Sequence, residues 1–174
     1  MKWCLALLIA LLPLVAQGGW IDRTEKPIPD TESMRSVGDF GVQIVLTANE
    51  GQFRQIWNST TTPPKLTTTN IVRLGEAVSA LLIFHGGVPN DSGVCDVFSE
   101  FILEAPDGKK TPAGGGKVWS GKPMQPGLLQ LGQASISVGF DKSDLVGDYK
   151  ITANVKDKVS GRALSVMVRL KVTK

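Results

Sequence analysis

The chain has 174 residues, one histidine, two cysteines and a formal net charge of +3 at neutral pH. That length suits one domain of ordinary size with its own hydrophobic core. Because the charge is nearly balanced and the lysines are scattered, the composition argues against nucleic acid or an acidic surface as the partner.

The first eighteen residues have the pattern of a secretory signal peptide. Lys2 gives a short basic start, and residues 5–15 form an apolar run that is too short for a comfortable membrane span. Small residues then precede an expected cleavage site after Gly18. We therefore expect residues 1–18 to be removed, no membrane span to remain, and the protein to be periplasmic or secreted.

Cleavage at that site would remove Cys4 and leave Cys95 as the only cysteine of the mature chain. No intrachain disulfide could then form. Cys95 is expected either to be buried as a small apolar residue or to pair between chains.

Residues 19–64 are interpreted as an extended leader with a possible β-hairpin. Residues 19–36 mix prolines and charges without a period, and their Trp20 either packs onto the domain or is frayed. Alternating apolar residues, a turn at Asn49-Glu50-Gly51 and a returning segment from Gln52 to Trp57 predict a hairpin over residues 41–57. The threonine- and proline-rich connector after it predicts a main domain over residues 65–174. Whether the hairpin joins the main sheets stays open.

Short segments bounded by Gly, Pro, Asn or Asp predict strands throughout that domain. Ala77–Phe84 is apolar on both faces, which is typical of a central or doubly covered strand. At the C-terminus, strict alternation predicts a hairpin whose buried face carries Tyr149, Ile151, Ala153 and Val155, and then Leu164, Val166, Val168, Leu170 and Val172. The other expected strands are 70–74, 95–105, a short one around 118–119, and 134–140. Helical periodicity is absent outside the signal, so we predict an all-β sandwich of about seven or eight strands with an N-terminal hairpin or extension.

The segment Asp144-Leu145-Val146-Gly147-Asp148-Tyr149, followed by alternating apolar residues and a hairpin, resembles the start of the penultimate strand of immunoglobulin-like (Ig-like) domains. In those domains a tyrosine bonds back to the backbone of the preceding corner. The resemblance covers roughly residues 66–174 and implies structural roles for Tyr149 and Asp144, beside a buried Cys95. Two departures, the missing cysteine pair and the missing third-strand tryptophan, make the chain similar to the cysteine-poor Ig-like modules of bacterial exported proteins. Most members of that group bind or brace.

Catalytic patterns that depend on histidine are incomplete in this chain. Residues 84–87 are similar to the oxyanion segment of α/β-hydrolases, and residues 91–93 to a serine-protease motif. Both need a catalytic histidine besides the one at position 85, and a blue-copper site needs two.

Carboxylates offer two further alternatives. Asn90, Asp91 and Asp96 could contribute to a calcium site, and Glu100 with Glu104 could form a glycosidase pair. Solvated loop positions and an outer sheet face explain these residues better. We therefore predict a protein that is not an enzyme and has no cofactor and no metal.

An Ig-like scaffold would gather three loops at one end, at residues 85–93, 120–133 and 156–161. The candidate partner-binding residues there are His85, Asn90, Asp91, Lys156, Asp157 and Lys158. We predict a protein partner in the cell envelope, with a carbohydrate- or small-ligand-binding module using Trp57 or Trp119 as the alternative. Edge strands could also accept a strand from a neighbour. The partner's identity and the oligomeric state stay open.

Overall fold

The computed structural model describes residues 19–22, 24–59, 65–125 and 127–174, and the expected signal peptide lies outside them. The described residues form β1 (Met34–Val37), β2 (Phe40–Thr47), α1 (Glu50–Ser59), β3 (Ile71–Arg73), β4 (Ala77–His85), β5 (Cys95–Glu104), β6 (Lys110–Gly121), β7 (Gln130–Gly139), β8 (Gly147–Asp157) and β9 (Ala163–Thr173). The prediction of an all-β fold with little helix is confirmed. Among the described residues, no helix has the length and apolar character needed to cross a bilayer.

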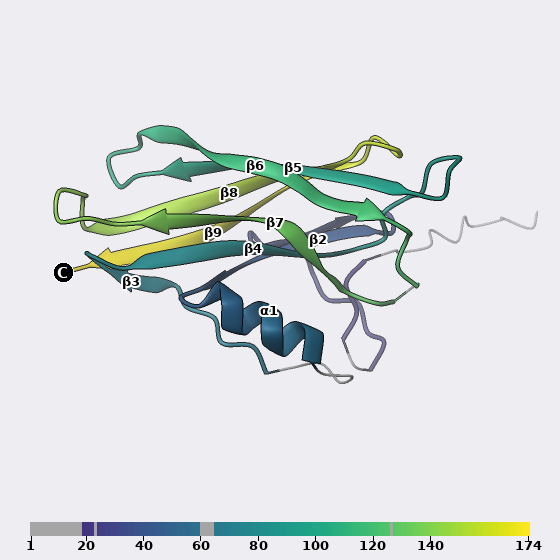
Figure 1. The fold of residues 1–174 in the computed structure, drawn as a ribbon, viewed down its shortest axis with the longest axis horizontal. Helices are drawn as coiled ribbons and strands as arrows, with labels where there is room; N and C mark the ends of the chain where they lie inside the picture. The colour runs from purple at the N-terminus through teal and green to yellow at the C-terminus, as the bar shows by residue number, and fades with distance from the viewer. Residues whose placement is uncertain (1–18, 23, 60–64, 126) are drawn as a thin grey trace, which may run out of the picture.

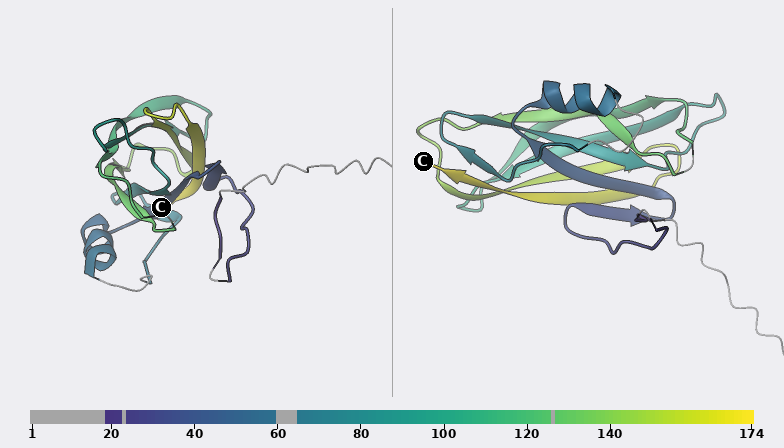
Figure 2. Two further views of the ribbon diagram at one scale, coloured as in Figure 1. Left: turned by 90° about the vertical axis from the view of Figure 1, so that its right-hand side faces the viewer. Right: turned by 90° about the horizontal axis from the view of Figure 1, so that it is seen from below.

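The strands form two sheets that pack against each other (Figure 1, Figure 2). The first sheet has the order β1-β2-β4-β7, and the second has the order β3-β9-β8-β5-β6. Neighbouring strands are antiparallel except β3 and β9, which run parallel. One cluster of buried side chains joins the facing sides of the two sheets, so the core lies between the layers.

The predicted C-terminal hairpin is present as β8 and β9. Its register pairs Tyr149 with Leu170 and Val155 with Leu164. The residues expected to face inward are buried along β8, and along β9 they are buried or half-buried. The alternation in the sequence therefore marks the inner face of the second sheet.

β4 is buried on both faces, as its continuous apolar sequence predicts. Phe84 faces the main core, whereas Leu81 and Ile83 belong to a second cluster on the outer side of the first sheet. Trp20 of the leader, Phe53 of α1 and Leu131 of β7 complete that cluster, and α1 lies across this face (Figure 1). Of the two alternatives for Trp20, packing onto the domain is the one observed.

The predicted hairpin over residues 41–57 is wrong in its second half, where the chain forms α1. Asn49 caps this helix: its side-chain oxygen accepts a hydrogen bond from the Gln52 amide at 2.9 Å, and its carbonyl accepts one from the Phe53 amide at 3.0 Å. Phe53 and Trp57, one helical turn apart, both contact the second cluster. A capping residue and an apolar helix face therefore outweigh the turn signal of Asn49-Glu50-Gly51.

Residues before position 65 form part of the sandwich. β2 lies inside the first sheet, paired with β4 from Gly41–His85 to Thr47–Ser79. The first half of the predicted hairpin thus joins a main sheet, and the leader is not separate from the domain expected at 65–174.

β6 is longer than the predicted short strand around Val118 and Trp119, because it includes the three glycines that were expected to form a loop. Gly115 allows β6 to approach β5, since a Cβ at this position would lie 2.4 Å from the Ser99 carbonyl oxygen. The pairing of the two strands also shifts register twice. Close strand approach, and not a turn, accounts for the glycine run.

Candidate functional site

His85, the first of the predicted partner-binding residues, packs between the leader and the first sheet. Its ring meets Trp20 edge to face, with 4.9 Å between the ring centroids. The imidazole packs so closely on Gly41 that a Cβ at that position would lie 2.1 Å from Nε2. The same nitrogen is buried and has no hydrogen-bond partner among the described residues. Burial lowers the pKa of His85, against a smaller opposing effect from a hydrogen bond with the Asp39 backbone.

Asn90 closes the turn between β4 and β5. Its side-chain oxygen accepts hydrogen bonds from the amides of Ser92 and Val94, both at 3.0 Å, as Asx turns do. Asp91 is exposed beside it, so its carboxylate is accessible to a partner. The described part of the chain contains no group of three or more His, Cys, Asp or Glu residues placed to hold a metal ion.

Asp157 is fully buried and holds two loops together. Its carboxylate accepts hydrogen bonds from the Val88 amide at 3.1 Å, the Val159 amide at 3.1 Å and the Ser160 hydroxyl at 2.6 Å. Val88 belongs to the loop after β4, whereas the other two donors lie between β8 and β9. Two of the three predicted loops, 85–93 and 156–161, therefore meet at one end, where Asp157 acts as an internal clamp.

Lys156 and Lys158 line a groove of about 630 Å³ on the outer face of the second sheet, together with Phe98, Leu164 and Ser165. The Lys158 ammonium lies 4.6 Å from the centroid of the Phe98 ring and 3.9 Å from the Asp96 carboxylate. Lys156 is exposed and stands opposite Ala163 in the pairing of β8 with β9. This groove adjoins the predicted loop end but belongs to the sheet.

The residues predicted to be structural, Tyr149, Asp144 and Cys95, make local hydrogen bonds or lie buried. The Tyr149 hydroxyl bonds the Leu145 carbonyl, and the Asp144 carboxylate accepts a hydrogen bond from the Asp141 amide at 2.8 Å. Cys95 is buried, with its thiol 3.4 Å from the Gly87 carbonyl oxygen. Burial, and then the charge of Asp157, raise the pKa of that thiol.

The tryptophans proposed for sugar binding lie in different packing environments. Trp57 contacts the outer cluster of the first sheet, whereas Trp119 packs against the main core beside Phe84. The Trp119 indole nitrogen also donates to the Lys122 carbonyl at 3.0 Å. The two rings do not form a shared flat platform.

The candidate catalytic side chains are also far apart in the fold. His85 lies on the first sheet, and Glu100 lies on the outer face of β5 in the second. Glu104, on the same face, bonds Lys150 at 2.7 Å, and this hydrogen bond lowers the pKa of its carboxyl. The core between the sheets therefore separates the histidine from both glutamates.

Three of the sheet edges are protected by specific features. Along β1, the Arg35 carbonyl accepts a hydrogen bond from the Trp20 indole at 3.1 Å. On β7, the Arg54 guanidinium donates to the Gly132 carbonyl at 2.9 Å. β6 contains Pro112 and two register shifts, which are devices that discourage a further strand from pairing.

The edge of β9 from Ala163 to Arg169 lies beside β1 and β2 of the first sheet, and a Cβ on Gly38, in the turn between those two strands, would lie 3.3 Å from the Arg162 guanidinium. β3 pairs only with residues 171–173, and the Glu32 carbonyl accepts a hydrogen bond from the Met167 amide at 2.7 Å. Because strand amides alternate in direction, those of Ala163, Ser165 and Arg169 point to this same edge. Since the first sheet and the leader occupy this side of β9, the edge is not a free surface. The groove on the outer face of the second sheet, lined by Phe98, Lys156, Lys158, Leu164 and Ser165, is the candidate functional site.

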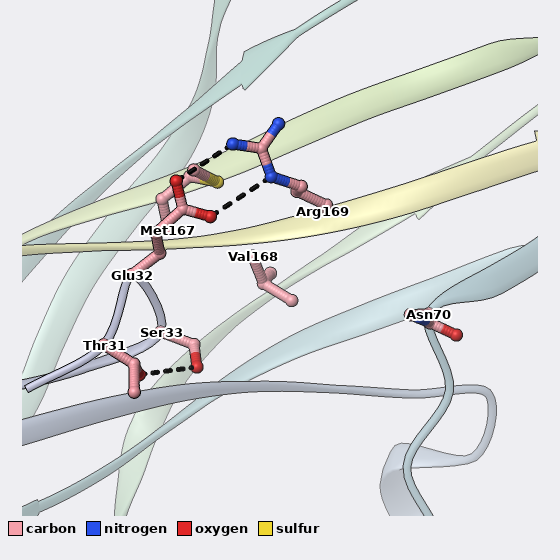
Figure 3. Close-up of a pocket in the computed structure, with 7 residues that line it drawn as sticks. All are labelled: Thr31, Glu32, Ser33, Asn70, Met167, Val168 and Arg169. Carbon is pink, nitrogen blue, oxygen red and sulfur yellow. Dashed lines mark hydrogen bonds and ion pairs between the residues drawn. The ribbon is translucent and has the colours of Figure 1, made fainter.

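Figure 3 shows where the leader crosses this edge, beside a pocket of about 430 Å³. The Glu32 carboxylate receives two hydrogen bonds from Arg169, at 3.1 Å from Nε and 2.9 Å from Nη2. These bonds hold the pKa of Glu32 below its ordinary value. Thr31, Ser33, Asn70, Met167 and Val168 complete the lining.

The sequence predicted the strands that carry the groove of the second sheet but not the groove itself. Alternation identifies which face of a strand is exposed, whereas a groove depends on which strands lie side by side. A usable signal was the aromatic Phe98 on the outer face of the strand expected at 95–105.

No family model and no curated protein matches the sequence. Among solved structures, the chain is similar to the sporulation control protein Spo0M from Bacillus subtilis, with 13% identity, a TM-score of 0.45 and coverage of 79% of this chain and 51% of that chain. It is also similar to a Niemann-Pick type C2 protein from the Japanese carpenter ant, with 9% identity, a TM-score of 0.39 and coverage of 75% and 89%.

A further similarity is to a family 123 glycoside hydrolase from Clostridium perfringens, with 10% identity, a TM-score of 0.41 and coverage of 76% of this chain and 27% of that chain. The chain spans about half the length of the sporulation control protein. Similarities of this degree assign no function.

Proposed function

We propose that the chain is an exported, non-enzymatic Ig-like protein that binds a protein partner in the periplasm or at the cell surface. The observation that carries the proposal is the groove on the outer face of the second sheet, where Phe98 and Leu164 line one hollow together with the exposed cations Lys156 and Lys158. Export is supported by the N-terminal sequence pattern.

The strand order supports the Ig-like part of the proposal. In Ig-like domains the second and fifth strands share one sheet, and the third and the last two share the other. β4 with β7, and β5 with β8 and β9, correspond to these sets. The hydrogen bond of Tyr149 to the preceding corner agrees with this assignment, and β1 and β2 are additions to it.

A groove that combines apolar and charged side chains favours a protein as the partner. Protein interfaces have an apolar centre and a polar rim, and Phe98 and Leu164 with Lys156 and Lys158 offer that combination. The predicted loop end adds an accessible charge at Asp91.

The test is to find the partner by position and then alter the groove. A photo-crosslinking amino acid at Ser165, in cells that express the protein, should capture a partner that the same group at Thr111 on β6 does not. With that partner purified, Phe98→Ala combined with Lys156→Glu should weaken binding at least about ten-fold, because the double change removes apolar area and reverses a charge in the groove.

Lys142→Glu is the matched control, since it reverses an exposed charge outside the groove and should leave affinity within about two-fold. Circular dichroism and thermal unfolding establish that both variants are folded. Equal binding of the groove variant and the control variant contradicts the proposal.

A further inference from the structure

We propose that the groove on the outer face of the second sheet binds an acidic amphipathic helix of the partner. The helix lies across the strands, with one apolar residue on Phe98 and one carboxylate on each side of that ring. This inference rests on the proposed function and specifies the partner. The outer face of the first sheet is covered by α1 and the leader, whereas the lysines of the groove are exposed.

Strand pairing places the Phe98 ring between two lysines. Phe98 of β5 stands opposite Lys156 of β8 on one side and opposite Lys117 of β6 on the other, and these three strands lie side by side (Figure 1). Residues opposite each other in paired strands project from the same face of the sheet. Because neighbouring strands are about 4.8 Å apart, the two lysine backbones lie about 10 Å apart, with Phe98 midway between them.

The charges along this row favour an acidic ligand. Lys117 and Lys156 are both exposed, and within the described residues neither takes part in an ion pair. Glu100, the one carboxylate in the lining of the groove, lies in the next row and also has no ion pair among these residues. The two lysines outnumber it, so a ligand that brings one carboxylate to each lysine is favoured.

A third lysine already shows that a charged group can pack on the ring. The Lys158 ammonium lies 4.6 Å from the centroid of Phe98 and 3.9 Å from the Asp96 carboxylate. The nearby carboxylate of Asp96 is thus directed to Lys158, which leaves the lysines at the two ends of the row for a ligand.

Small residues leave room for a helix beside the ring. In the next row Gly115 stands opposite Glu100, and Ser165 stands opposite Asn154. Phe98 is half-buried and lines the hollow above these positions, so part of its apolar surface is accessible. An apolar side chain of the ligand would cover that surface.

The spacing of the row fits a helix better than an extended segment. On one face of a helix, residues i, i+4 and i+7 lie about 6 Å and about 10.5 Å apart along the axis, close to the spacing from one lysine to the ring and to the second lysine. In an extended segment, successive residues on one face are about 6.6 Å apart, so the two carboxylates would lie about 13 Å apart. The pattern expected in the ligand is therefore acidic at i, apolar at i+3 or i+4, and acidic at i+7.

A second copy of this chain does not supply that pattern. In the described residues the one helix is α1, where Glu50 is followed by Phe53 three positions later but by Trp57 at the seventh. Phe53 is also buried in the second cluster. Two copies packed face to face through the groove would bring their lysines together, where like charges repel. We therefore commit to a helix of a different protein.

The test uses three alanine-based peptides of about eighteen residues, a length at which helices form in water. The first has Glu at i and i+7 with Leu at i+3 and i+4, the second has Lys in place of both Glu residues, and the third has the composition of the first with both Glu residues moved to the opposite helix face. Each is titrated into the protein and followed by backbone amide NMR. The first peptide should shift the amides of Phe98, Lys117 and Lys156 and bind at least about ten-fold more tightly than the other two at about 50 mM salt. That preference should shrink at about 500 mM salt.

Variants of the row make the result specific. Lys117→Glu combined with Lys156→Glu should reverse the preference, so that the Lys peptide binds more tightly than the first peptide. Phe98→Ala should weaken binding of the first peptide at least about ten-fold, because the apolar anchor loses its contact. Lys142→Glu, outside the groove, should leave all three affinities within about two-fold. Circular dichroism establishes that each variant is folded.

The outcomes separate this inference from the proposed function. Equal binding of the three peptides, shifts elsewhere, no shifts, or a dimer that Phe98→Ala dissociates overturns the acidic helix as the ligand. The proposed function survives those results as long as the purified partner is lost from the variant with Phe98→Ala and Lys156→Glu. Partner binding by that variant equal to binding by Lys142→Glu overturns the proposed function itself.

Discussion

The Tyr149 hydroxyl donates a hydrogen bond to the Leu145 carbonyl oxygen across 2.9 Å, which joins the start of β8 to the corner before it. The same ring packs edge to face on Phe140, with 5.0 Å between the ring centroids. One side chain therefore connects the end of β7, the corner and β8, and so links the two sheets at this end of the sandwich.

Tyr149→Phe should lower the free energy of unfolding by about 1 kcal/mol, because the ring contacts remain and only the hydrogen bond is lost. Chemical denaturation followed by tryptophan fluorescence measures this difference. Tyr149→Leu is the comparison: it also loses the aromatic contact with Phe140 and should cost more. Equal losses for the two variants would show that the hydroxyl contributes nothing.

His85 should make the free energy of unfolding depend on pH near neutrality, at pH values above those at which carboxylates titrate. Burial depresses its pKa in the folded protein below the ordinary value of 6.5, so the unfolded chain binds more protons in that window. Stability is therefore fully present above the unfolded-state pKa and is lost as pH falls from there toward the folded pKa.

The measurement is the free energy of unfolding between about pH 7.5 and about pH 5.5. His85 is the only histidine of the chain, so His85→Gln should flatten this dependence. Trp20, in contact with the imidazole, offers a local fluorescence signal for the same change. A slope that persists in the glutamine variant argues against His85 as its source.

The sequence predicted the parts of the fold that depend on local patterns. The inward rows of β8 and β9, the two-sided burial of β4 and the tyrosine corner all follow from alternation or a short motif, and all are present. Two signals in the sequence indicate the helix: Asn49 as a capping residue with Gln52 three positions later, and apolar residues at positions 53 and 57. Gly51 pointed instead to a turn, which is why a hairpin was predicted.

The site could not be predicted in the same way, because it depends on contacts between distant segments. Asp157 looked like a loop charge, yet it is buried because it accepts the amide of Val88, 69 residues away. The groove combines Phe98 of β5, Lys156 of β8 and Leu164 of β9, and only the pairing of these three strands brings the side chains together.

Asp157→Ala should destabilise the domain by about 3 kcal/mol, because it leaves the amides of Val88 and Val159 and the Ser160 hydroxyl without their acceptor. Denaturant midpoints at neutral pH measure the loss. Asp91→Ala is the control, as an exposed loop carboxylate in the neighbouring turn should change stability by less than about 0.5 kcal/mol. A small effect of Asp157→Ala would mean that water replaces the carboxylate and that the clamp is dispensable.

Ser99→Ala should stabilise the domain, by up to about 1 kcal/mol, although it deletes a polar group from the core. Ser99 is fully buried on the inner face of β5, and its hydroxyl has no hydrogen-bond partner among the described residues, so the desolvation of that group is not compensated. Ser79→Ala is the matched comparison on β4, because Ser79 is also buried but its side chain hydrogen-bonds Glu50, and its loss should cost about 1 kcal/mol. Thermal and urea unfolding of the two variants side by side should therefore give shifts of opposite sign. A loss of stability in Ser99→Ala similar to that in Ser79→Ala would show that the Ser99 hydroxyl is bonded in solution, for example to a water held between β5 and β6.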